Sequence, residues 1–269
     1  NCVSAVNITS SYTSDRCGAG GLISFIYTNT QVTITDCLVK GSINASGAGR
    51  KGMGGFVYSQ NGTCTFNNCL YLGTNNAESD EGNYTFGPAG ATITNCYYLN
   101  ACGEAQGMQV TEEQLKNGAV AYKLQNGRSE NVWGQKLGTD NEPQLTAEAA
   151  KHVYEVKFTL NNEVKATRYA NSGGRVKLPT AKELLGADYD AQKSYTLTFE
   201  NGFSKTTGIY GDTTVSVTVN VVTGIDGVTD DNADMNAPVY DLQGRYLGTS
   251  LEGQPAGIYI VNGRKIVVQ

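Results

Sequence analysis

Three short segments in the first hundred residues alternate apolar and polar positions, and each ends in Asp or Asn followed by Cys. They are Val32–Cys37, Cys64–Cys69 and Ala91–Cys96. Alternation with a period of two residues predicts strands, and the Gly, Asn and Ser clusters between the segments predict turns. The closing cysteines are 32 and 27 residues apart, a spacing that is typical of stacked repeats.

One copy of about 30 residues cannot bury its own apolar face, whereas stacked copies can share a continuous core. We therefore expect strands stacked copy on copy. In such a stack Cys37, Cys69 and Cys96 would form a buried column. Asp36, Asn68 and Asn95 would form a hydrogen-bonded ladder. An antiparallel sandwich whose strands have similar sequences is the alternative.

All seven cysteines lie in the first 102 residues. Their odd number, the lack of a Cys-x-x-Cys pair and the single histidine of the chain argue against a zinc site. Disulfides remain an alternative in an exported protein. The position of the cysteines within the repeat favours buried free thiols.

Two of the segments follow a second repeated element, Gly20–Ile23 in one case and Gly54–Val57 in the other. This element, together with the TITDC and TITNC strands, resembles the GLUG-type repeats of bacterial surface proteins. The resemblance implies a right-handed parallel β-helix over residues 1–105, in an exported adhesin-like protein or, less often, a carbohydrate-active one. The third copy departs from the family pattern, because Thr85–Pro88 lacks the double glycine.

Residues 106–147 predict a short helical cap that covers the apolar end of the stack. Thr111 and Gln114 fit a capping box, and the apolar positions that follow predict two short helices ending near residues 126–127. Trp133 is the only tryptophan. We expect it to pack inside the cap, and a platform on which a sugar stacks is the alternative.

Residues 148–223 predict a small β-domain, with alternating segments at 154–160, 175–179, 195–199 and 215–219. The domain resembles the short β-grasp-like repeats of bacterial surface proteins, which implies a spacer. Within it, Asp212-Thr213-Thr214 resembles the short O-glycosylation motif of exported Bacteroidetes proteins. That resemblance implies Thr213 as a glycosylation site.

Residues 224–269 predict an acidic linker and a C-terminal β-hairpin tail with a type I′ turn at Asn262-Gly263. The tail resembles the C-terminal sorting tail of the type IX secretion system of Bacteroidetes through its YDLxGR and PxGIYI boxes. The matching residues are Tyr240, Asp241, Leu242, Gly244, Arg245, Gly257, Ile258 and Tyr259. The resemblance implies export by that secretion machinery to the outside or the outer-membrane surface. Gln269 departs from it, since a basic residue is more usual at the end.

The chain lacks the residue combinations that most catalytic sites need. His152 is the only histidine and is expected in a linker beside Lys151, and without a histidine no Ser-His-Asp or Cys-His arrangement can form. Glu78, Asp80 and Glu81 could bind calcium, but a solvated loop is the favoured interpretation. The acidic residues 226–234 do not have EF-hand spacing. We therefore predict no enzyme activity, no cofactor and no metal site.

Composition narrows the class of protein further. The 33 Gly and 16 Tyr favour turns and strands over helices, and an all-β chain is expected. A net charge of −5 without a basic stripe argues against nucleic-acid binding. No apolar stretch approaches the roughly 20 residues that a membrane-spanning helix needs.

These patterns predict a non-catalytic secreted or cell-surface protein, adhesin-like or structural, with an extended binding face. Glycans and host or cell-surface proteins are the expected partners. Because Asn1 opens within patterned sequence, we expect a fragment of a longer protein. The alternative is the C-terminal part of a β-helix polysaccharide lyase or glycoside hydrolase whose catalytic turns lie upstream.

Overall fold

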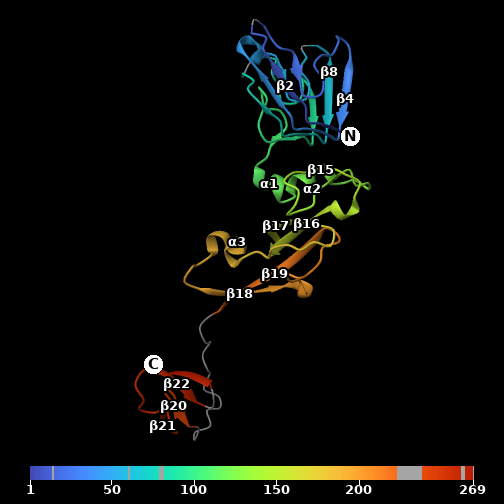
Figure 1. Ribbon diagram of the computed structural model, residues 1–269. Helices are drawn as coiled ribbons and strands as arrows, with labels where there is room; N and C mark the ends of the chain where they lie inside the picture. Colours follow the sequence, from blue (N-terminus) through green and yellow to red (C-terminus); the bar gives the residue numbers. More distant parts are fainter. Residues whose placement is uncertain (14, 60, 79–81, 223–237, 262–263, 269) are drawn as a thin grey trace. The chain divides into compact units, whose positions relative to one another are not determined.

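The computed structural model describes the chain except for residues 14, 60, 79–81, 223–237, 262–263 and 269 (Figure 1). It divides into two compact units, residues 1–189 with 197–219 and residues 190–196 with 220–269. The expected acidic linker and the Asn262-Gly263 turn lie outside the described residues.

Strands of the first hundred residues pair in parallel with their counterparts in the next copy. One three-stranded sheet contains β4 (Gln31–Thr35), β8 (Thr63–Asn67) and β11 (Thr92–Thr94). A five-stranded sheet contains β1 (Cys2–Ser4), β5 (Cys37–Val39), β9 (Leu70–Tyr71), β12 (Tyr97–Tyr98) and β13 (Met108–Gln109). The others are β2 (Asn7–Ser10), β6 (Ser42–Ala45) and β10 (Thr74–Asn75) in one sheet, and β3 (Ala19–Gly20) with β7 (Met53–Gly54).

A shared apolar core lies between these sheets. The register places Phe66 beside Ile34 on one side and beside Ile93 on the other. Phe56, Phe66 and Phe86 are fully buried, and the ring centroids of Phe56 and Phe86 are 5.1 Å apart. Aromatic pairs at such distances add to the free energy of apolar burial, so residues from different copies stabilise one another.

Gly20 and Gly54 occupy places where the backbone passes close to itself. A Cβ at Gly20 would collide with the carbonyl oxygen of Ile23, and a Cβ at Gly54 with that of Val57. Only glycine removes this collision. The close approach explains why the Gly-Gly element recurs in the sequence.

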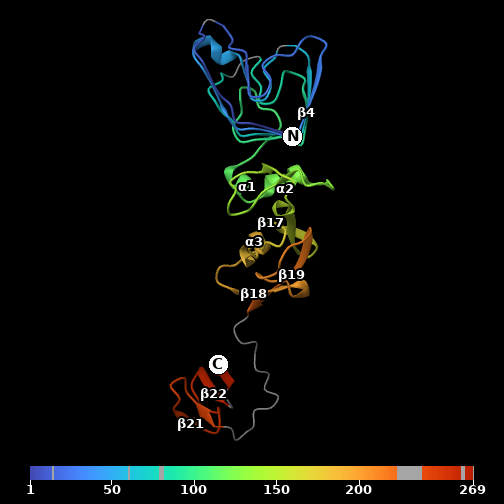
Figure 2. The ribbon, with the colours of Figure 1, turned by 45° about the vertical axis from the view of Figure 1, so that its right-hand side comes forward.

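The prediction of an all-β chain built on a right-handed parallel β-helix is wrong. The described residues form seven sheets of two to five strands, with 13% helix and 38% strand, and no continuous solenoid. In the turned view the strands of the first region lie in separate walls joined by long loops (Figure 2). Parallel pairing between copies is present, but it extends over only short strands.

The row of strands that contains the Gly-Gly element pairs over only short stretches. A glycine in a strand contributes no side chain to packing and weakens the strand. The Gly-Gly element accordingly pairs over two residues in each of β3 and β7. In the third copy, which lacks the double glycine, this row continues only as isolated bridges from Tyr84 to Gly54 and to Glu104.

The two helices predicted after the repeats are present. They are α1 (Glu112–Lys116) and α2 (Ala119–Gln125), and the short strands β14 (Trp133–Gly134) and β15 (Gln144–Leu145) follow. The capping box is confirmed, because the Gln114 amide donates to the Thr111 hydroxyl at 3.2 Å and the Thr111 amide donates to the Gln114 side chain at 3.0 Å. Apolar residues of this segment and of the repeats form one cluster that includes Leu38, Leu70, Leu115 and Leu124.

A four-stranded sheet follows, in the order β17-β16-β19-β18. Its strands are β16 (Val153–Leu160), β17 (Glu163–Asn171), β18 (Ser194–Phe199) and β19 (Thr213–Val222). β16 pairs with β17 antiparallel and with β19 parallel. Helix α3 (Ala181–Leu185) precedes β18, and 3-10 turns occupy Gly47–Lys51, Ala149–Lys151, Gly186–Asp188 and Glu200–Gly202.

The strand predicted at residues 175–179 is wrong. This segment has no ladder partner, although Val176 packs in the core of the sheet. The strand that follows β16 in the chain is β17, reached through Asn161 and Asn162, which both have positive φ. A two-residue loop of this kind is a hairpin signal. Helix α3 was also missed, although Thr180 and Glu183 form a capping box.

The C-terminal residues form a four-stranded antiparallel sheet, and the expected hairpin is part of it. Its order is β21-β20-β22-β23, with β20 (Val239–Tyr240), β21 (Tyr246–Gly248), β22 (Gly257–Val261) and β23 (Arg264–Val268). Val239, Tyr259 and Val261 form its buried core.

Candidate functional site

One residue in each copy turns the chain from one sheet into the next. These corner residues, Asp36, Asn68 and Asn95, have φ values of 54°, 52° and 49°. This left-handed conformation is costly for most L-residues, and Asn and Asp tolerate it best after glycine. The recurrence of Asp or Asn before Cys therefore has a local backbone cause.

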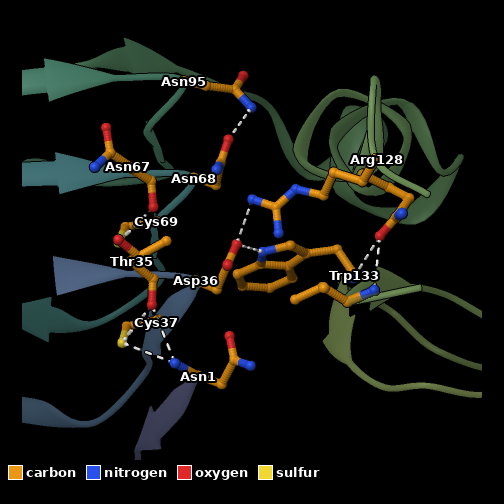
Figure 3. Close-up of polar contacts among 12 residues, drawn as sticks. Asn1, Thr35, Asp36, Cys37, Asn67, Asn68, Cys69, Asn95, Arg128 and Trp133 are labelled. Atoms are coloured by element: carbon orange, nitrogen blue, oxygen red, sulfur yellow. Dashed lines mark hydrogen bonds and ion pairs between the residues drawn. The ribbon is translucent and has the colours of Figure 1, made fainter. Parts of the chain in front are cut away.

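Asp36 is buried and binds two residues of the helical segment (Figure 3). Its Oδ1 accepts a hydrogen bond from Trp133 Nε1 at 3.0 Å and lies 2.6 Å from Arg128 Nη2. A buried carboxylate requires such partners, because loss of hydration is otherwise too costly. Asp36 thus fastens the helical segment to the repeats.

Trp133 is fully buried. The packing interpretation of this residue is therefore confirmed, and the alternative of a sugar-stacking platform on its ring is wrong. The Gln125 side-chain oxygen accepts from the Trp133 amide at 2.8 Å, which fixes the backbone at the start of β14.

The expected Asp/Asn ladder divides into two parts. Asn95 Nδ2 donates to Asn68 Oδ1 at 2.7 Å and to the Lys123 carbonyl oxygen at 3.0 Å. Asp36 instead directs its carboxylate to Arg128 and Trp133. Sequence inspection missed Arg128, because neither its spacing nor its neighbours indicate a buried partner far away in the chain.

The structure brings the predicted cysteine column together. Register pairs Cys2 with Cys37, and the pairs that follow place Cys37, Cys69 and Cys96 as stacked neighbours. The Cys69 amide lies 3.4 Å from Cys96 Sγ. Cys37, Cys69 and Cys96 are buried, and all seven cysteines are free thiols.

Burial and mutual contact hold most of these thiols in the protonated form. Contact with the Cys69 thiol, followed by burial, raises the pKa of Cys37 well above its ordinary value. Contact with the Cys37 thiol lowers the pKa of Cys69, but contact with Cys96 and burial outweigh it and raise that pKa to about 12. The Cys69 contact lowers the pKa of Cys96. Burial raises the pKa of Cys102 to about 12. Because the thiolate is the reactive form, the raised values favour a packing role.

Most of the tail residues gather around one hollow of ≈330 Å³ in the C-terminal sheet. Six of the eight matching residues line it: Asp241, Leu242, Arg245, Gly257, Ile258 and Tyr259. The other two lie nearby in sequence. The Tyr240 ring centroid is 5.8 Å from that of Tyr246, and Gly244 has a φ of +82°.

A network around Asp241 fixes the shape of this tail segment. Asp241 Oδ1 accepts from the Gln243 amide at 3.0 Å and the Arg245 amide at 2.8 Å, and Oδ2 lies 2.6 Å from Arg245 Nε. The Arg245 amide and then its guanidinium hold the pKa of Asp241 below its ordinary value. Tyr259 donates its hydroxyl to the Pro255 carbonyl oxygen at 2.6 Å.

The remaining candidate residues are scattered. Thr213 is half-buried at the start of β19, and its hydroxyl donates to the Gly211 carbonyl oxygen at 2.8 Å. The Glu78 carboxylate pairs with Arg50 at 3.3 Å, and Asp80 and Glu81 lie outside the described residues. Glycosylation of Thr213 stays a prediction.

Across the part of the chain that the structure describes, no three His, Cys, Asp or Glu side chains are grouped suitably for a metal ion. Among the same residues, no helix combines the length and apolar character needed to cross a membrane. No family model, curated protein or solved structure matches the chain.

Proposed function

We propose that the chain is a non-catalytic secreted or cell-surface protein, adhesive or structural, that carries a C-terminal sorting signal. The observation that carries this proposal is the gathering of six tail residues, from separate strands and turns, around one hollow. A concave surface with a few fixed polar groups suits specific recognition. Its charged groups are Asp241 and Arg245, which bind each other, and Asp241 also accepts from backbone amides.

The use of buried polar groups in the repeats supports a structural role for that region. Asn83 is fully buried, and its side chain donates to the carbonyl oxygens of Arg50 and Glu78 and accepts from the Met53 amide. Asp36 is similarly engaged. Buried side chains that bind other parts of the fold in this way hold loops together.

Export tests the proposal directly. The chain, preceded by an export leader, is expressed in a bacterium with a type IX secretion system and in a strain that lacks the translocon. Protease-accessible protein on the cell surface or in the medium is expected only in the first strain. Retention in both strains would contradict the proposal.

A double substitution, Asp241→Ala with Arg245→Ala, separates the hollow from the mere presence of a tail. We expect it to abolish export, because the pair shapes the hollow. Glu252→Ala is the matched control, since Glu252 is exposed in the same unit and does not line the hollow. Hydrolysis and lyase assays on polysaccharides are expected to show no bond cleavage.

A further inference from the structure

A second hollow lies in the larger unit, where the end of α2 meets the start of β16. Its volume is ≈160 Å³. Its lining includes Tyr122, Arg128, His152, Tyr154 and Asp212. Pockets for drug-sized molecules are larger, about 300 Å³ or more, so this hollow suits a ligand the size of a single ring.

Aromatic side chains form part of the wall. The His152 ring stacks on the Tyr154 ring, with centroids 4.6 Å apart and an interplanar angle of 24°. The two residues are separated by one position on the chain, so they lie on the same side of the backbone. Tyr122 lines the hollow from α2 and donates its hydroxyl to Glu155 at 3.3 Å.

Several polar groups in the wall have bonding capacity left over. Within the described residues, the Tyr154 hydroxyl and the His152 ring nitrogens make no hydrogen bond. Asp212 Oδ1 accepts from the Glu155 amide at 2.9 Å. Its other oxygen, Oδ2, accepts no hydrogen bond from the residues that the structure describes, so it can accept one from a ligand. Hydroxyl groups, which both donate and accept, match such a mixed set.

The charges of the wall favour a neutral ligand. Arg128 is already paired with Asp36 at 2.6 Å, so an anion would gain little from it and would meet the carboxylate of Asp212. A cation would meet the guanidinium of Arg128. A neutral molecule with several hydroxyl groups and an apolar face satisfies the wall without either penalty.

We propose that this hollow binds one neutral monosaccharide unit of a glycan. The apolar face of the sugar ring packs on Tyr154 or Tyr122, and its hydroxyl groups bond to Asp212 and His152. The inference names a partner for the adhesive form of the proposed function and rests on it for its biological meaning. The binding itself does not require export.

Saturation-transfer NMR on the full chain tests the site. The probes are free glucose, galactose, mannose, N-acetylglucosamine and N-acetylgalactosamine, each titrated to find a dissociation constant on the order of 1 mM, as expected for so small a contact. At least one sugar should show transfer. No transfer from any of the five overturns the proposal.

Two single variants and one control assign the signal to the hollow. Asp212→Asn and His152→Ala should each weaken binding about tenfold, the loss expected for one good hydrogen bond. Tyr210→Ala should bind as the parent does, because Tyr210 is 76% exposed and lies outside the hollow. Unchanged binding by both hollow variants, with their folding checked by circular dichroism, refutes the assignment. Failure here with normal export would leave the sorting proposal standing.

Discussion

The repeats and the sheet of residues 153–222 use one backbone device in two different ways. In the repeats, Asp36, Asn68 and Asn95 take the left-handed conformation at corners between different sheets. In the later sheet, Asn161 and Asn162 take it in a hairpin that joins adjacent strands β16 and β17. The first arrangement brings together residues about thirty positions apart, whereas the second joins immediate neighbours in the sequence.

The comparison teaches that the repeats depend on contacts between copies. Strands of two to five residues are too short to be stable alone. They gain stability from the aromatic core and from contacts with the helical segment, such as Asp36 with Arg128 and Lys40 with Glu142 at 2.8 Å. Strands β16 and β17 are eight and nine residues long and pair along almost their full length.

The largest expected effect comes from Asp36→Ala. Removal of the carboxylate leaves the Arg128 guanidinium and the Trp133 indole N–H without their buried partner, at a cost of about 3–5 kcal/mol. Chemical denaturation gives the loss in the free energy of unfolding. Asp36→Asn keeps an amide that tolerates the left-handed corner, so it should cost less. A loss below that of an ordinary surface substitution would show that the helical segment is not fastened at Asp36.

A matched pair, Asn68→Ala and Asn162→Ala, measures what the ladder adds to the backbone cost. Both substitutions place Ala in a left-handed conformation, at about 1–2 kcal/mol each. Only Asn68→Ala also removes the 2.7 Å bond from Asn95, worth about 1 kcal/mol more. Substitution by Gly at each position should remove the cost of the left-handed conformation. The remaining difference in the free energy of unfolding between the two sites, measured by thermal and urea unfolding, is then the contribution of the Asn68–Asn95 hydrogen bond. Equal losses would mean that the Asn68–Asn95 contact contributes nothing.

The third effect is absent at neutral pH, appears only in base, and concerns the region that holds the cysteines. Burial raises the pKa of Cys102 to about 12, from an ordinary value of 9.0. Above pH 9 the unfolded chain therefore releases the thiol proton while the folded chain retains it. Stability is fully present below pH 9 and falls as pH rises toward 12, by about 1.4 kcal/mol per pH unit for this one thiol.

Unfolding measured from pH 8 to pH 10.5 in the parent and in Cys102→Ala tests this slope. The variant should be less sensitive to base, even if it is less stable at pH 8 because of the lost sulfur. Cys2→Ser is the control, since Cys2 is exposed and should leave the slope unchanged. The same slope in parent and Cys102→Ala would contradict a protonated, buried thiol.

Local signals in the sequence succeeded wherever the cause was local. The Thr111–Gln114 capping box predicted α1, and alternation predicted β16 and β19. Two local signals were overlooked, the Asn161-Asn162 hairpin turn and the capping box of Thr180. The strand expected at 175–179 failed because alternation reports burial of one face, and Val176 is buried without pairing.

Local sequence signals account for the corner residues, the Gly-Gly close approaches, the cap helices and the grouping of the tail residues along the chain. Tertiary structure alone decided that the copies form several short sheets, that Asp36 binds Arg128 and Trp133, and that Tyr154 and Asp212 share a hollow with Tyr122. The physical reason is the distance along the chain over which each interaction acts. Backbone conformation depends on a few neighbouring residues, whereas burial, ion pairing and the shape of a hollow depend on side chains that folding brings from distant parts of the chain.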